Sequence, residues 1–404
     1  MKVIKRKGKE RSMAKPLIML SIFSVMNMLV CSAYSQVPSN PRVKKIVSES
    51  CGIDTHNHVD VPLDSAHIPG PKLDLAKDIQ KSGFAAICMT FAVDYQKLTY
   101  PGEAYNRFLN GLTSMDSVLK NNEMKRALTV KDIVKAHNQN KPIVIQSIEG
   151  GHFLEGKIER LQVAYDRGLR LLTLLHDNDA SVPLGDIYTN QPQWGGLTEF
   201  GAKVIKECER LGILIDLTHC DNKTIDMVLK VATKPVIISH TGLDTQLGEN
   251  TRMANMMKPR LISKKQAKKI ADAGGLIGVW THLAESPLEY AKNIHAMVDV
   301  VGIDHVCIGT DSKLTKPYRG AFKPDSQGSR LPDKNNDMPK DLKQNSPQGE
   351  RIGERTNLLW KDQTDGFMYT VADALLKTGF SETDIEKISG GNFLRIFGAA
   401  TMKR

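Results

Sequence analysis

The sequence lacks the short motifs that would place it in several common classes of protein. None of its six cysteines forms a CxxC pair, which argues against a zinc ribbon and against a thiol redox site. No GxGxxG motif lies between a predicted strand and a predicted helix, which argues against a dinucleotide-binding sheet. Once Cys31 is removed with the N-terminal segment described below, the odd number of cysteines that remains favours buried free thiols.

The first 36 residues differ in composition from the rest of the chain. A basic head is followed by an apolar segment at 16–30 and by small residues at Ala33 and Ser35. Because the apolar segment is short for a membrane span, the pattern predicts a signal peptide over residues 1–35 and a periplasmic or secreted protein. An uncleaved anchor and a lipoprotein attached through Cys31 are the alternatives, and the bulky Val30 argues against lipidation. No stable membrane span is expected after cleavage.

The basic character of the chain comes largely from this N-terminal segment. The full sequence has 55 basic and 45 acidic residues, of which the first 36 residues hold seven and one. The rest of the chain therefore has 48 basic and 44 acidic residues and a net charge of about +4 instead of +10. Since no nucleic-acid-binding motif accompanies this small excess, no nucleic-acid partner is predicted.

Eight short apolar segments, rich in β-branched residues, predict the strands of a parallel sheet. They lie at 46–53, 85–91, 142–148, 169–175, 213–217, 235–239, 276–279 and 305–309. Segments of helical periodicity lie between most of them, at 197–211, 264–273 and 288–301 among others. Eight such units predict an α/β fold, a (β/α)8 TIM-type barrel in a single domain over 36–404. A doubly wound open sheet is the alternative.

A polar segment interrupts this pattern after the eighth predicted strand. Residues 312–358 are rich in Lys, Asp, Asn, Pro and Gly and contain few apolar residues. This composition predicts an insertion in the form of a long loop over the active face or a partly disordered flap. Helical segments at 367–377 and near 390–397 then complete the chain.

Side chains that can bind metal ions gather at the ends of six predicted strands. They are His56 and His58, Glu149, His176, His219, His240 and Asp311. In a parallel barrel, side chains just past the carboxyl ends of the strands face one site. His56 and His58 are two residues apart and can hold one cation together. The pattern predicts a metal-dependent hydrolase in which Glu149 bridges two zinc ions and Asp311 transfers protons for bound water.

Five stretches of sequence carry a resemblance to a known family. They are SIEGG at 147–151, GLTEFG at 196–201, IDLTH at 215–219, ISH at 238–240 and GGNFLR at 390–395. Together, over residues 52–397, they resemble the membrane (renal-type) dipeptidases, which are zinc enzymes of the amidohydrolase superfamily. The resemblance implies two zinc ions, hydrolysis of the peptide bond of small dipeptides by a metal-bridged hydroxide, and a homodimer.

The resemblance implies metal-binding roles for individual residues. The matching positions are His56, Glu149, His219 and His240. His56 is expected to bind one zinc ion, Glu149 to bridge both, and the other two histidines to bind the second. The family usually has an aspartate where this sequence has His58, and a neutral ligand there leaves the site one charge more positive. A shifted alignment, with His58 and Asp60 as the first-strand ligands, is the alternative.

Three further residues match positions that act on the substrate in this family. The resemblance implies that His176 contacts the substrate carbonyl oxygen and stabilises the tetrahedral intermediate. It implies that Arg260 holds the terminal carboxylate, a role that suits a bidentate guanidinium, and that Asp311 is the acid and base. The family tends to continue Phe-Asp-Gly after this aspartate, whereas this chain continues Ser-Lys-Leu into the polar insertion. The rim that faces the substrate is therefore expected to differ from that of the family.

Two other functions stay open. Because the rim that faces the substrate differs from that of the family, one alternative is an amidohydrolase that acts on another small amide or ester. The altered first-strand ligands and the insertion at 312–358 allow a barrel with impaired catalysis and a binding role.

Overall fold

The structure is a computed structural model that describes residues 40–318, 356, 360, 363 and 365–402. The predicted signal peptide at 1–35 and residues 319–355 of the predicted insertion lie outside the described residues. The described residues from Asn40 onward form one compact unit. None of the helices in the described part of the chain has the length and apolar character needed to span a membrane.

Eight parallel strands form the centre of this unit. They are β1 (Ile53–His58), β2 (Ala86–Thr90), β3 (Ile143–Glu149), β4 (Leu169–Thr173), β5 (Leu214–Asp216), β6 (Ile237–Thr241), β7 (Leu276–Val279) and β8 (Val306–Ile308). Each pairs with the next in sequence. A two-residue strand, β9 (Ser312–Lys313), follows β8 after three residues and pairs with β1, so the last strand closes the sheet. The predicted (β/α)8 barrel is confirmed, and the open sheet is excluded.

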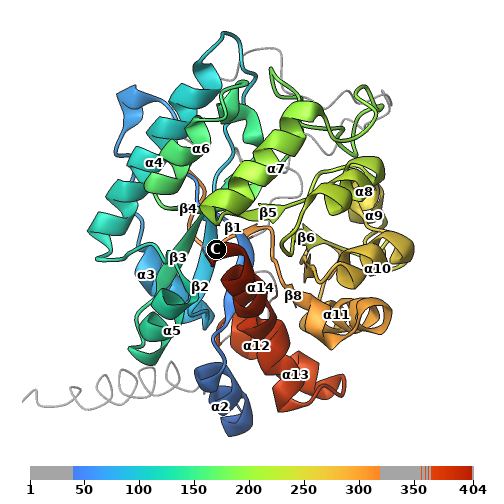
Figure 1. Cartoon of the computed structure of the whole chain (residues 1–404). Helices are drawn as coiled ribbons and strands as arrows, with labels where there is room; N and C mark the ends of the chain where they lie inside the picture. The colour runs from blue at the N-terminus through green and yellow to red at the C-terminus, as the bar shows by residue number, and fades with distance from the viewer. Residues whose placement is uncertain (1–39, 319–355, 357–359, 361–362, 364, 403–404) are drawn as a thin grey trace, which may run out of the picture. The chain divides into compact units, whose positions relative to one another are not determined.

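Helices connect the strands and cover the outside of the barrel (Figure 1). Those between strands are α3 (Leu75–Ser82), α4 (Glu103–Asn121), α5 (Val130–Asn138), α6 (Arg160–Asp166), α7 (Glu199–Leu211), α8 (Asn222–Val231), α9 (Thr251–Met257), α10 (Lys264–Asp272) and α11 (Pro287–Val301). The helices outside the repeat are α2 (Pro41–Glu49), α12 (Phe367–Lys377), α13 (Glu382–Glu386) and α14 (Asn392–Thr401). The predicted helices α7, α10, α11 and α12 are confirmed to within two residues at each end.

The first strand lies later in the sequence than the predicted segment 46–53. The first half of that segment belongs to helix α2, whose buried face includes Ile46 and Val47. Strand β1 instead consists of polar residues for most of its length, and all six of its residues are buried. As a result, His56 and His58 belong to the strand itself, at the carboxyl end of β1.

The predicted polar insertion also begins later than residue 312. Ser312 and Lys313 form β9, and both are buried. The Lys313 ammonium pairs with the Asp60 carboxylate, and the backbone N–H of Leu314 donates to Asn57 Oδ1 over 3.1 Å. The residues that directly follow Asp311 are therefore part of the barrel wall, held by contacts with β1 and its following loop.

The amino-terminal half of the barrel is filled by apolar side chains. Each of the strands β1 to β8 contributes to one buried cluster, which also includes Phe393 and Phe397 from α14. Burial of such apolar surface stabilises the fold by about 25 cal/mol per Å². Polar side chains further along the same strands are consequently held at the carboxyl end of the barrel. The cysteines of the described residues are free thiols, four of them buried, as predicted.

Candidate functional site

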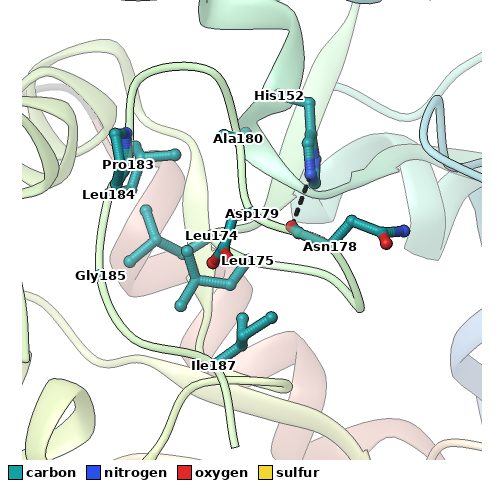
Figure 2. A pocket seen from close by; sticks show the side chains of 11 residues that line it. His152, Leu174, Leu175, Asn178, Asp179, Ala180, Pro183, Leu184, Gly185 and Ile187 are labelled. Atoms are coloured by element: carbon teal, nitrogen blue, oxygen red, sulfur yellow. Dashed lines mark hydrogen bonds between the residues drawn. The ribbon is translucent and has the colours of Figure 1, made fainter. Parts of the chain in front are cut away.

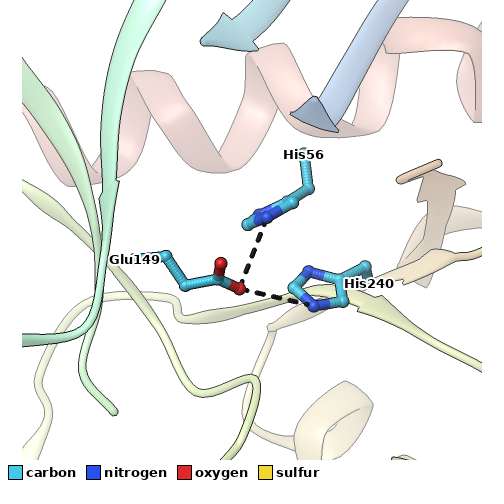
Figure 3. A group of neighbouring side chains, drawn as sticks. All are labelled: His56, Glu149 and His240. Carbon is cyan, nitrogen blue, oxygen red and sulfur yellow. Dashed lines mark ion pairs between the residues drawn. The ribbon is translucent and has the colours of Figure 1, made fainter. Parts of the chain in front are cut away.

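Glu149, the last residue of β3, lies among five histidines that come from four other strands or the loops after them. Its side chain is only 2% exposed. The shortest distances from an imidazole Nε2 to its carboxylate are 2.9 Å for His219, 3.3 Å for His176, 3.4 Å for His56, 3.6 Å for His58 and 3.7 Å for His240. Figure 3 shows His56 and His240 directed at this carboxylate from β1 and β6. The barrel thus brings all the predicted metal ligands together.

The two glycines after Glu149 allow the chain to pack tightly beside it. Gly150 has a φ of 88°, in the left-handed region, and a Cβ atom there would collide with the ring of His152 and lie 3.1 Å from His176 Cβ. A Cβ atom on Gly151 would lie 3.1 Å from the carbonyl oxygen of Leu174. The absence of side chains at these two glycines therefore allows other parts of the chain to pack directly against the end of β3.

The buried charge at Glu149 fits a site for cations. Burial opposes ionisation of Glu149, but His176 and His56 outweigh that effect and hold its pKa well below the usual carboxyl range. Its Oε2 atom has no hydrogen-bond partner among the described residues. Burial lowers the pKa of His56 and takes that of His240 well below its usual value, which favours the neutral form of each imidazole. Neutral imidazoles and a carboxylate are the ligands that zinc uses in proteins.

The spacing of the candidate ligand atoms agrees with metal coordination. The groups that could hold an ion are His56–Glu149–His240, His56–His58–Asp311 and Glu149–His176–His219, each with its ligand atoms within 4.8 Å of one another. Zinc–nitrogen bonds of about 2.0–2.1 Å place tetrahedral ligand atoms about 3.3 Å apart. The two Nε2 atoms of His56 and His58 are 3.3 Å apart, and His58 Nε2 is 3.2 Å from Asp311 Oδ1. The residues present therefore fit metal ions.

Of the two alternatives for the first strand, His58 lies in the site and Asp60 does not. The Asp60 carboxylate pairs with Lys313 and accepts a hydrogen bond of 3.2 Å from the backbone N–H of Tyr318. His58 contacts Asp311 and Glu149, and its Nδ1 atom is 3.0 Å from the hydroxyl of Tyr95. The geometry favours the alignment that uses both histidines of β1.

Asp311 faces the site from the junction between β8 and β9. It has a φ of 51°, a left-handed conformation that interrupts the strand, and its backbone N–H donates to the His56 carbonyl over 3.1 Å. Burial opposes ionisation of its carboxyl, but His240 and His58 keep the pKa well below the usual range. Its Oδ2 atom lies 3.7 Å from Nε2 of His282, which follows β7 and was missed in the sequence.

His176 is held by an aspartate that sequence reasoning also missed. Asp94 follows β2, and its Oδ1 atom is 2.6 Å from His176 Nδ1. Asn178 donates a hydrogen bond of 3.0 Å to its other oxygen. Burial lowers the pKa of His176, but Asp94 and Glu149 raise it to about 10. The raised pKa favours the protonated ring, whose Nε2 atom lies 3.3 Å from Glu149 Oε2. The strand-end rule that found the other residues points to Asp94 and His282 as well.

Arg260 lies beside the metal-binding group, in the 3₁₀ helix η3 (Lys258–Arg260). The hydroxyl of Thr241 donates to its carbonyl oxygen over 2.9 Å and anchors η3 to the end of β6. The Nη2 atom of Arg260 is 2.8 Å from Asp177 Oδ2, and the Arg260 guanidinium lies 5.9 Å from the centre of the Tyr188 ring. The Tyr188 hydroxyl in turn lies 2.7 Å from His219 Nδ1, so Arg260 and a candidate metal ligand share the same surroundings.

A small cavity lies beside the site, between the β3 and β4 loops (Figure 2). It is lined by Gly151, Leu174 and Leu184 among others, and the His152 ring contacts the Asn178 carbonyl oxygen over 2.8 Å at its edge. Its volume of about 10 Å³ holds about one water molecule. The cavity is therefore too small to bind a substrate.

A (β/α)8 barrel with histidines and carboxylates at the carboxyl ends of its strands defines a metal-dependent hydrolase. The family model described as membrane dipeptidase (Peptidase family M19) matches residues 40–318. The chain belongs to this family, which makes it a metal-dependent enzyme that hydrolyses peptide bonds.

Solved structures share the fold. An amidohydrolase from Pseudomonas aeruginosa is 22% identical, with a TM-score of 0.67, over 89% of this chain and 99% of that one. A metallopeptidase from Rhodobacter sphaeroides, with a bound phosphinate mimic of the dipeptide L-Ala-D-Ala, is 17% identical with a TM-score of 0.60. That match covers 86% of this chain and 99% of the other.

Proposed function

We propose that the protein is a zinc-dependent dipeptidase that holds two zinc ions and acts in the periplasm or outside the cell. The observation that carries this proposal is the buried carboxylate of Glu149 with five imidazole Nε2 atoms within 3.7 Å. The family match supports peptide-bond hydrolysis, and the related metallopeptidase with a dipeptide mimic supports a small substrate. The location follows from the signal peptide predicted at residues 1–35.

The metal ligands in this proposal come from four strands. His56 and His58 would hold one zinc ion and His219 and His240 the other, with Glu149 as the carboxylate that would be shared between them. When bound, the zinc ions supply a water of lowered pKa and polarise the carbonyl of the scissile bond. With imidazole at position 58, this set has one carboxylate for two ions, and the charge of nearby Asp311 compensates in part.

Two residues act on the substrate as the peptide bond breaks. The N–H of His176 donates to the oxygen that becomes negative in the tetrahedral intermediate, and Asp94 keeps the ring oriented for this role. Asp311 accepts a proton from the attacking water and passes it to the leaving amine. Arg260 binds the carboxyl-terminal end of the substrate.

Metal content tests this proposal directly. We expect about two zinc ions per chain by elemental analysis of the purified protein, loss of dipeptide hydrolysis after chelation, and recovery after zinc is added back. A panel of dipeptides measures the activity before and after chelation. A protein with less than one zinc ion per chain and no hydrolysis would instead support the impaired barrel with a binding role, and the dipeptidase proposal would be wrong.

Arg260→Ala is expected to reduce dipeptide hydrolysis by about 30-fold or more, mainly through KM. The substitution removes the guanidinium that contacts the carboxyl-terminal end of the substrate and leaves Asp177 facing the substrate without its arginine partner. Steady-state kinetics on one dipeptide measures the effect, and Arg252→Ala, at an exposed arginine of α9, is the matched control. Unchanged kinetics in Arg260→Ala would favour an amidohydrolase that acts on a different small amide or ester.

A further inference from the structure

Asp177 lies between Arg260 and a candidate metal ligand. It follows His176 in the loop after β4, and its Oδ2 atom is 2.8 Å from Arg260 Nη2. Its Oδ1 atom is 3.3 Å from His219 Nδ1. The side chain of Asp177 is 29% exposed and that of Arg260 is 15% exposed, so the pair is largely but not completely shielded from solvent. A carboxylate of the protein therefore already pairs with the guanidinium that is expected to bind the substrate.

This pair changes what Arg260 can recognise. A lone guanidinium attracts a carboxylate, whereas an arginine next to an aspartate has almost no net charge as seen by an approaching ligand. A substrate carboxylate would gain the contact with Arg260 but would also meet the negative charge of Asp177. A carboxamide fits the pair better, because its oxygen accepts from the guanidinium and its N–H groups donate to the carboxylate.

We propose that Asp177 is a specificity-determining residue, and that the Arg260–Asp177 pair recognises a neutral carboxamide end of the substrate. The enzyme then hydrolyses dipeptide amides about as well as free dipeptides. This inference rests on the proposed dipeptidase function and names its substrate class more closely. It makes Asp177 the residue that keeps the enzyme from depending on a free terminal carboxylate.

Tyr188 offers a control for the second contact of Asp177. Its hydroxyl is 2.7 Å from the same Nδ1 atom of His219 that Asp177 approaches, and its ring stacks on His219 with centroids 5.3 Å apart. Tyr188→Phe keeps the ring below Arg260 and removes only the hydroxyl next to His219. It therefore disturbs the surroundings of the candidate metal ligand without changing the charge beside the guanidinium.

The test compares one dipeptide with its own carboxyl-terminal amide. The quantity measured is the ratio of kcat/KM for the two substrates in the wild type, Asp177→Asn and Tyr188→Phe. Both substrates use the same metal site, so any change in zinc binding affects both and cancels in the ratio. Zinc per chain is measured in each variant as a separate readout.

We expect a wild-type ratio within about fivefold of unity and an increase of about tenfold or more, in favour of the free dipeptide, in Asp177→Asn. Asparagine keeps the shape of the side chain and an oxygen for Arg260 but removes the charge. Tyr188→Phe is expected to keep the wild-type ratio. Should Asp177→Asn fail to fold, as judged by circular dichroism, Asp177→Ser removes the same charge and takes its place.

Two outcomes would overturn the assignment of Asp177 while leaving the dipeptidase intact. One is a wild-type enzyme that prefers the free dipeptide by more than about a hundredfold, and the other is a ratio that does not change in Asp177→Asn. A wild-type protein with bound zinc that hydrolyses neither substrate would overturn the proposed function itself. The two failures are therefore distinguishable in the same experiment.

Discussion

Replacing Glu149 by glutamine is expected to remove bound zinc and to lower kcat/KM for a dipeptide by roughly 1,000-fold or more. Glutamine has nearly the same volume, so the packing against the β3 end is preserved. It has no charge to balance two cations, and its amide N–H₂ group would point at imidazole nitrogens that need to bind metal. Because five histidines lie within 3.7 Å of this one carboxylate, this single substitution alters contacts with all five of them.

Elemental analysis and kinetics on the same preparation measure the effect of Glu149→Gln. The matched control is Glu123→Gln, at an exposed glutamate just after α4, which should keep wild-type zinc content and activity. Thermal unfolding of the zinc-free proteins distinguishes loss of metal binding from loss of the fold. Two zinc ions and normal turnover in Glu149→Gln would exclude a bridging role for this residue.

The barrel could be predicted because most of its strands are apolar. Seven of the eight predicted segments overlap an observed strand along most of its length, since a strand covered on both faces reads as a continuous apolar run. Strand β1 does not follow that rule. Asp54 is completely buried there, and the hydroxyl and N–H of Thr310, 256 residues away, donate to its carboxylate. The hydrogen bonds that allow Asp54 to be buried come from a residue far away in the sequence. They therefore produce no periodic pattern from which a buried strand could be recognised.

The site was predictable where the apolar run that marks a strand continues to within two residues of a metal-binding side chain, as at His176, His219 and Asp311. Asp94 and His282 lie three residues beyond the predicted runs at 85–91 and 276–279 and were therefore missed, although His282 is no further from its strand than those three residues are from theirs. Arg260 is in no strand, and only the resemblance to the family indicated it. Its pairing with Asp177 joins residues 83 apart and depends on how η3 is placed against the β4 loop.

The positions of His58 and Asp60 show how tertiary pairing separates two candidate ligands from the same stretch of sequence. Both residues belong to the same short polar stretch, and both can bind metal ions. The difference between them comes from Lys313, which pairs with Asp60 because β9 lies alongside β1. The sequence around 312 looked like the start of a polar loop, so this partner could not be recognised from composition.

Asp311→Asn is expected to reduce kcat by about 10²–10⁴-fold with a much smaller change in KM. The carboxylate that accepts and returns a proton is replaced by an amide that does neither, while the shape at the β8–β9 junction is kept. The left-handed backbone at φ 51° also suits asparagine, so the fold should tolerate the change. Asp272→Asn, at an exposed aspartate in α10, is the matched control and should behave as the wild type.

The zinc content of Asp311→Asn decides between two roles for this residue. Its Oδ1 atom is 3.2 Å from His58 Nε2, close enough for proton transfer at the site and also for a place among the metal ligands. Two zinc ions per chain with the expected loss of kcat would support proton transfer. Loss of one zinc ion would make Asp311 the carboxylate ligand that His58 does not provide, and a wild-type kcat would exclude both roles.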